Sequence, residues 1–108
     1  MNIGQIAKMA QQMQTQMAQA QQELKETTLE ASAGGGAVRI VITGAQEVRT
    51  VEIDPSAVDP QEVEMLQDLV MTAINDAIGR SKELERERMG RIAGGMGLPG
   101  MPGLPGLG

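Results

Sequence analysis

Hydrophobic residues recur at every second position in the central part of the chain. Val38, Ile40 and Ile42 occupy alternate positions, which is the period of a strand that buries one face. A short turn over residues 44–47 follows, and a second alternating run covers residues 48–53. These two runs and the turn between them predict an antiparallel hairpin.

A third alternating run precedes the hairpin. It covers residues 29–33 and leads into three consecutive glycines, residues 34–36. Glycine adopts positive φ without strain, which suits a tight reversal of the chain. The central part of the chain therefore predicts a three-stranded antiparallel meander.

The residues before the meander repeat with a helical period. Residues 3–26 carry an apolar stripe at spacings of three and four, the pattern of a helix that packs against another helix. A membrane-surface helix is the alternative, but such helices carry many basic residues on their polar face. Because this segment has only Lys8 and Lys25 among its many glutamines, we interpret it as a packing helix.

The residues after the meander predict a second long helix. Asp59 as N-cap, Pro60 at the first helical position and Glu62 form an aspartate version of the capping box. The helix is expected to end near Met89, and beyond Leu84 it is wholly polar, so we expect this end to project into solvent. The fold class is α+β, an α-β-β-β-α protomer with the meander between two long helices.

Composition changes after the second helix. Residues 94–108 contain only Gly, Pro, Leu and Met, which suggests no packed structure. We expect one domain over residues 1–91 and a disordered tail over residues 92–108.

The chain has no aromatic residue, so a monomer must build its core from smaller side chains and leaves apolar surface on both helices. We therefore expect a homodimer.

Few residue types that carry catalysis are present. The chain has no His, Cys or Tyr, and its serines lie beside no activating base in the sequence. The carboxylates do not follow the spacing of a calcium loop, and residues 34–36 lack the Lys and Ser or Thr of a phosphate-binding loop. We expect no enzyme activity, no metal, no cofactor and no small-molecule substrate.

The segments that direct proteins to membranes are also missing. The first twenty residues lack a basic start followed by a continuous apolar run, so we expect no signal peptide, and no apolar run is long enough to span a membrane. The absence of cysteine fits a reducing compartment. We expect a cytoplasmic protein without a membrane partner.

Positive charge gathers near the end of the second helix. The net charge of −5 argues mildly against nucleic acid, but its distribution is uneven. Residues 79–91 carry five basic and three acidic side chains, whereas residues 1–78 carry four and eleven. The five basic residues are Arg80, Lys82, Arg86, Arg88 and Arg91.

Two interpretations of this basic end remain open. In the first it is a solvated helix end whose charges pair along the helix, as Glu83 with Arg86 and Glu87 with Arg91. In the second, two copies of it in a dimer straddle the phosphates of one duplex.

Several stretches together resemble the YbaB/EbfC family of nucleoid-associated proteins. They are the Met/Gln-rich residues 8–14, the glycines 34–36 with the strand after them, residues 47–48 leading to 53–55, residues 64–70, residues 73–77 and the Gly/Leu/Pro tail. The resemblance covers nearly the whole chain. It implies an α-β-β-β-α protomer, a tweezer-like homodimer and binding to double-stranded DNA with limited sequence preference, and it brings no catalytic residues.

The main hypothesis is a nucleoid-associated, DNA-binding homodimer that acts in chromosome organisation and gene regulation. Its phosphate contacts are expected from the five basic residues of the second helix, with Lys8 and Lys25 as helpers. The alternative is a protein–protein interaction or assembly module whose association with DNA is only indirect. The two hypotheses differ in whether the purified protein binds naked DNA.

Overall fold

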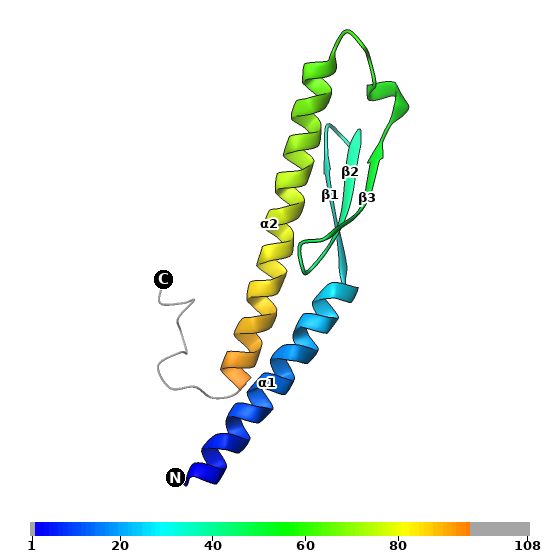
Figure 1. Ribbon diagram of the computed structural model, residues 1–108. Coiled ribbons are helices and arrows are strands. Elements are labelled where there is room, and N and C mark those ends of the chain that lie inside the picture. The colour runs from blue at the N-terminus through cyan, green and yellow to red at the C-terminus, as the bar shows by residue number, and fades with distance from the viewer. Residues whose placement is uncertain (1, 96–108) are drawn as a thin grey trace, which may run out of the picture.

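The computed structural model describes residues 2–95, which form two long helices and a three-stranded sheet (Figure 1). In chain order the elements are α1 (Ile3–Glu26), β1 (Thr28–Ala33), β2 (Val38–Thr43), β3 (Val48–Ile53), the short 3₁₀ helix η1 (Pro55–Ala57) and α2 (Val63–Gly95). This is the α-β-β-β-α order that the hydrophobic pattern predicts, and the class is α+β.

The sheet is an antiparallel meander in the order β1-β2-β3. Ile40 of β2 lies opposite Ala31 of β1 and Val51 of β3, so these three side chains share one face. The glycines 34–36 between β1 and β2 all have positive φ, between 65° and 97°, a conformation that only glycine adopts without strain. The expected tight reversal is confirmed at these glycines.

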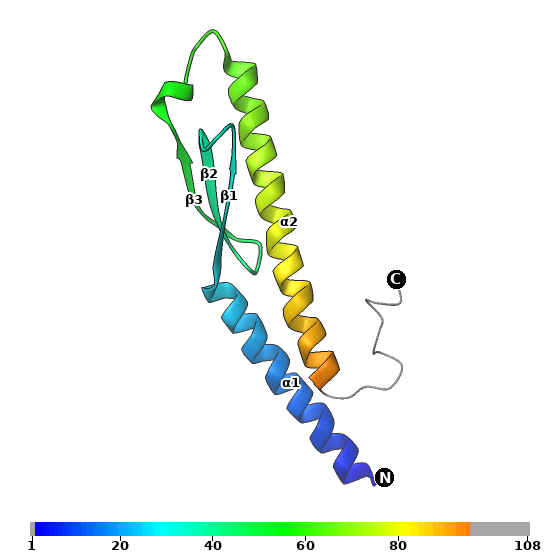
Figure 2. The ribbon, with the colours of Figure 1, turned by 180° about the vertical axis from the view of Figure 1, so that it is seen from behind.

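One face of this sheet packs against α2. Val38, Ile40 and Ile42 of β2 are completely buried, as are Ala73 and Ala77 of α2. The small alanine side chains let the helix axis approach the sheet, and each fully buried valine or isoleucine contributes about 1.5–3 kcal/mol. Figures 1 and 2 show α2 running beside β1 and β2, with β3 at the far edge. All six residues of β3 are consequently exposed.

α1 is held mainly at its C-terminal end. Ala20 and Leu24 are buried, whereas Ile3 is 83 % and Ile6 is 51 % exposed in the single chain. The helix begins where the Asn2 side chain accepts a hydrogen bond of 2.7 Å from the backbone N–H of Gln5. Figures 1 and 2 show that the N-terminal half of α1 extends past the end of α2. The expectation of a packing helix therefore holds within the chain only for its last turns.

The start of α2 differs from the expected one. The helix begins at Val63, not at Pro60. The Asp59 side chain accepts a hydrogen bond of 2.9 Å from the N–H of Gln61, and its carbonyl accepts one of 2.8 Å from the N–H of Glu62. Asp59 therefore closes a separate turn before the helix, and the capping-box prediction is wrong.

The end of α2 also differs. The helix continues to Gly95, past the expected end near Met89, and includes the first four residues of the expected tail. Ile92 and Ala93 in this last turn are half-buried, so they continue the partly buried face of the helix. The prediction for residues 96–108 lies outside the described residues.

Candidate nucleic-acid interface

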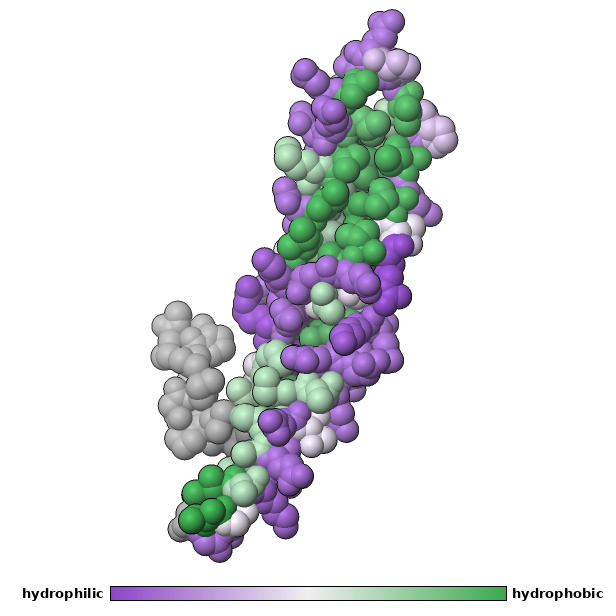
Figure 3. All heavy atoms as spheres, in the orientation of Figure 1, coloured by the Kyte–Doolittle hydropathy of each residue, from purple (hydrophilic) through white to green (hydrophobic). Residues whose placement is uncertain are grey.

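The five basic residues predicted to contact DNA lie along the C-terminal part of α2. At about 1.5 Å per residue, the segment from Arg80 to Arg91 is roughly 17 Å long. Figure 3 shows hydrophilic side chains gathering beyond the sheet, next to a hydrophobic area that covers the upper part of the molecule. The structure therefore brings the five residues together along one helix, but it does not give them the same environment.

Three of the five basic residues form ion pairs with acidic residues of α2. They are Arg80 with Asp76 at 2.9 Å, Arg86 with Glu83 at 2.5 Å and Arg91 with Glu87 at 2.6 Å. The two pairs proposed for a solvated helix end are thus confirmed. These arginine side chains are more than half exposed, and exposed pairs contribute only roughly 0–1 kcal/mol. A phosphate group can therefore replace each carboxylate at little cost.

Arg88 differs from the other four. Its side chain is only 28 % exposed, and its Nη1 lies 3.7 Å from Oε1 of Glu23 on α1, which is a charge contact too long for a hydrogen bond. The expectation that this polar end projects into solvent is wrong at Arg88, because α1 lies beside α2 there. Arg88 contributes positive charge from between the helices and connects them.

The lysines are distinguished from the arginines by their lack of ion pairs. Every arginine has a carboxylate within 4 Å, whereas Lys8, Lys25 and Lys82 have none among residues 2–95. Lys8 lies on the exposed half of α1 and lines two shallow surface hollows of about 310 and 490 Å³, mostly with glutamines. A phosphate that binds these ammonium groups displaces no internal partner.

Two further arginines were not singled out by the sequence. Arg39 donates a hydrogen bond of 2.6 Å to Glu30 across β1 and β2, and this bond raises the pKa of the guanidinium above its ordinary value. Arg49 pairs with Glu47 at 3.1 Å and donates to the backbone carbonyl of Lys25 at 3.2 Å. Arg39 is thus paired within the sheet, and Arg49 connects β3 with the end of α1.

An apolar patch covers the part of the surface next to the basic end. It combines exposed residues of β3 with residues around a hollow of about 450 Å³ on α2. Figure 3 shows the hydrophobic area over α2 and the neighbouring strands. The residues of the patch are Val48, Val51 and Ile53 of β3 and Leu66, Val70, Met71 and Ile74 of α2. Asn75 lines this hollow and also the next one along the helix, with Arg80, so the apolar patch and the basic end adjoin.

Residues 2–95 contain no group of three or more acidic side chains placed to hold a metal ion. No helix within that range has both the length and the apolar character needed to cross a membrane.

Proteins with the same sequence pattern are known from several bacteria. The chain is 48 % identical over 96 residues to a nucleoid-associated protein of Acetivibrio thermocellus, an alignment covering 89 % of this chain and 85 % of that protein. It is 49 % identical over 96 residues to one of Chloroflexus aurantiacus (89 % and 96 %) and 48 % identical over 102 residues to one of Moorella thermoacetica (92 % and 98 %).

The fold and the family are supported by two further comparisons. The crystal structure of the uncharacterized protein HP0035 from Helicobacter pylori superposes with a TM-score of 0.73 and 25 % identity, covering 81 % of this chain and 91 % of that one. The sequence profile of the YbaB/EbfC DNA-binding family matches residues 1–96, which include both helices and the whole sheet. The chain therefore belongs to the YbaB/EbfC DNA-binding family.

Proposed function

We propose that this chain is a nucleoid-associated protein that binds double-stranded DNA as a homodimer with limited sequence preference. The observation that carries the proposal is the family match over residues 1–96, together with relatives of about half-identical sequence that are named nucleoid-associated proteins. The role that follows is chromosome organisation and gene regulation at the nucleoid, in the cytoplasm, without a catalytic step.

The proposed contacts with DNA are electrostatic. The exposed basic side chains of α2 are Arg80, Lys82, Arg86 and Arg91, with Arg88 adding its charge from beside α1 and with Lys8 and Lys25 as helpers on α1. Contacts from such side chains to phosphates fix a protein on the duplex but carry no sequence information. Limited sequence preference is the expected result.

The proposed dimer forms through the apolar patch. Val51 is 50 % and Met71 is 56 % exposed in the single chain, and the chain has no aromatic side chain with which to cover them. A twofold interface places the same patch on both sides, so that each copy covers the other. The basic end adjoins the patch through Asn75, so a dimer formed here doubles the positive charge available to one duplex.

Binding to a labelled random-sequence duplex, read by fluorescence anisotropy over a range of salt concentrations, tests this function. If phosphate contacts dominate, the logarithm of the affinity falls with the logarithm of salt concentration by about 0.9 per phosphate neutralised. Replacing Arg80, Lys82, Arg86 and Arg91 by glutamine should flatten this slope and weaken binding at least tenfold.

Arg39→Gln is the matched control, because Arg39 is an exposed, paired arginine on the sheet away from α2. It should leave the affinity within about twofold of the wild type. The site assignment fails if the fourfold variant binds as well as the wild type. If the wild type binds no duplex even at low salt, DNA binding fails and the chain is a protein-interaction module.

A further inference from the structure

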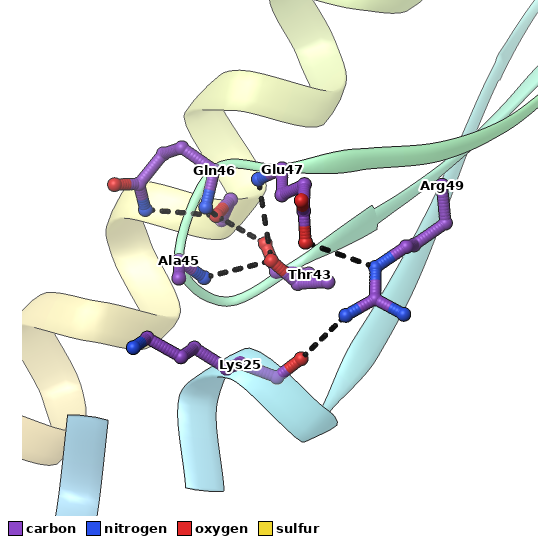
Figure 4. A network of polar contacts seen from close by, with 7 residues as sticks. Lys25, Thr43, Ala45, Gln46, Glu47 and Arg49 are labelled. Atoms are coloured by element: carbon purple, nitrogen blue, oxygen red, sulfur yellow. Dashed lines mark hydrogen bonds and ion pairs between the residues drawn. The ribbon is translucent and has the colours of Figure 1, made fainter. Parts of the chain in front are cut away.

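The β2–β3 turn contacts both helices. Thr43 ends β2, residues 44–47 form the turn, Ser81 approaches it from α2, and the last residues of α1 lie on its other side. Figure 4 shows Gln46 of the turn beside α2, and Arg49 reaching the backbone carbonyl of Lys25 at the end of α1. We call this cluster of Thr43, Gly44, Gln46 and Ser81 the joint.

Ser81 fixes the turn to α2. Its side chain is completely buried. The hydroxyl donates a hydrogen bond of 2.6 Å to the carbonyl of Thr43 and accepts from the backbone N–H of Gln46 at 3.1 Å and from its Nε2 at 2.8 Å. A hydroxyl has one donor and two acceptor positions, so every position is used. Without this oxygen the turn keeps its internal bonds, from the N–H of Gln46 to the carbonyl of Thr43 at 3.2 Å and from Nε2 of Gln46 to the carbonyl of Gly44 at 2.9 Å, but it loses these three hydrogen bonds to α2.

The turn is also held internally. Gln46 has a φ of 62°, in the left-handed region that non-glycine residues seldom adopt. Its side chain donates to the carbonyl of Gly44 at 2.9 Å, and the hydroxyl of Thr43 accepts from the backbone N–H groups of Ala45 and Glu47 at 3.1 and 3.2 Å. These bonds hold the turn in one conformation. The position of α2 therefore determines the position of the turn, and with it that of the end of α1.

The other side of the joint holds the end of α1. The last carbonyls of a helix have no partners within it, and here the turn supplies donors. The N–H of Gly44 bonds to the carbonyl of Leu24 at 2.9 Å and to that of Thr27 at 3.0 Å, and Arg49 donates to the carbonyl of Lys25. The fit is close, because a Cβ on Gly44 would lie 2.7 Å from Cδ2 of Leu24.

A small rotation at the joint moves the far end of α1 over a large distance. The helix is 24 residues long, or roughly 36 Å at 1.5 Å per residue. A rotation of about 10° at the joint therefore moves the far end by roughly 6 Å by the same geometry. That displacement exceeds the rise per nucleotide along the axis of a duplex, about 3.4 Å.

We propose that the joint sets the angle between α1 and α2 and thereby the spacing at which Lys8 on α1 and the basic end of α2 meet the duplex. The proposal rests on the proposed function and deepens it. Ser81 and Gly44 are positioning residues: they lie among the helices and the turn and touch no phosphate. Their effect on DNA passes through the placement of α1.

Distances between spin labels test the joint without DNA. The chain contains no cysteine, so the variants Gln14→Cys on α1 and Asp68→Cys on α2 place labels at two chosen exposed positions. Dilution with unlabelled protein keeps the measurement within one chain of the dimer. The wild type should give one narrow distance distribution, and Ser81→Ala should broaden it clearly.

The control variant is Ser56→Ala, which removes an exposed serine hydroxyl that bonds only to Asp54. It should leave the distribution unchanged. If Ser81→Ala does not fold, Gln46→Gly replaces it, because glycine keeps the positive φ and removes only the side-chain bonds. In anisotropy titrations the joint variant should bind DNA about three- to tenfold more weakly, with the salt slope of the wild type.

The outcomes separate the joint from the proposed function. Unchanged distances in folded Ser81→Ala and Gln46→Gly overturn the joint, even if both variants are less stable. Broadened distances with unchanged DNA affinity also overturn it, since the angle then has no bearing on binding. A wild type that does not bind DNA at all defeats the proposed function, while the label distances still decide whether the joint holds α1.

Discussion

Different interactions stabilise the two halves of the molecule. In the sheet half, consisting of β1–β3 and the first part of α2, Ile40 and Ala73 are completely buried. In the helical half, consisting of α1 and the end of α2, Ala20 and Leu24 are buried at the last turns of α1, and the basic end of α2 carries exposed ion pairs such as Arg91 with Glu87. A buried aliphatic side chain contributes about 1.5–3 kcal/mol, whereas an exposed ion pair contributes roughly 0–1 kcal/mol. Stability therefore resides in the sheet half, and the charges of the helical half can change without unfolding the chain.

The largest expected effect separates the two halves directly. Ile40→Ala removes a completely buried side chain and should lower the free energy of unfolding by about 2–5 kcal/mol. Arg86→Ala, at a side chain that is 71 % exposed, should change it by less than about 0.5 kcal/mol. Urea denaturation measures both. Equal losses in the two variants would contradict the division of roles between the halves.

The next prediction concerns the outer surface of the sheet half. Val51→Asp places a charge in the apolar patch and should weaken the dimer at least a hundredfold, because a carboxylate buried without a partner is costly. Thr50→Asp puts the same charge on the same strand but on the opposite face, and should leave the dimer intact. Sedimentation equilibrium gives both association constants. A dimer that survives Val51→Asp would place the interface elsewhere.

The elements of both halves follow from local sequence patterns. The strands were found because Val38, Ile40 and Ile42 repeat with the period of two that burial on one face requires, and the glycines 34–36 match their positive φ. The start of α2 was missed because Asp59 and Pro60 suit a helix cap and an isolated turn equally well. The hydrogen bonds that form the turn are donated by the backbone N–H groups of Gln61 and Glu62. Nearly every residue type has such a group, so the residue types do not distinguish the turn from the cap.

The contacts between the halves could not be foreseen. Ser81 bonds to Gln46, 35 residues earlier in the chain, and Arg88 reaches Glu23 on the first helix. No periodicity relates such distant positions, and each of these residues alone has the appearance of an ordinary polar residue on a helix or in a turn. The basic cluster on α2 was found because its members are close in sequence. The different environment of Arg88 depends on a neighbouring helix.

A smaller effect is expected where the halves meet. Gly44→Ala introduces a Cβ only 2.7 Å from Leu24 on α1 and should destabilise the chain by about 1–3 kcal/mol. Gly79→Ala is the matched control: a Cβ there has nothing within 4 Å, and alanine is the better helix former by about 1 kcal/mol. Thermal unfolding should therefore give shifts of opposite sign. A Gly44→Ala variant that is not destabilised would show that α1 yields easily at the joint.

The smallest effect is a pH dependence in the sheet half. The backbone N–H of Ser56, and then its hydroxyl, bond to Oδ1 of Asp54 and lower the pKa of this carboxyl below its ordinary value. Because the folded pKa lies below the unfolded one, the charge stabilises the fold above the unfolded pKa, and this stabilisation is lost as the pH falls through the folded pKa. Urea denaturation of the wild type and of Asp54→Asn should differ slightly near neutral pH and converge in acid. Ser56→Ala should keep most of the difference, because the backbone bond is the larger cause, and a complete loss in that variant would assign the effect to the hydroxyl instead.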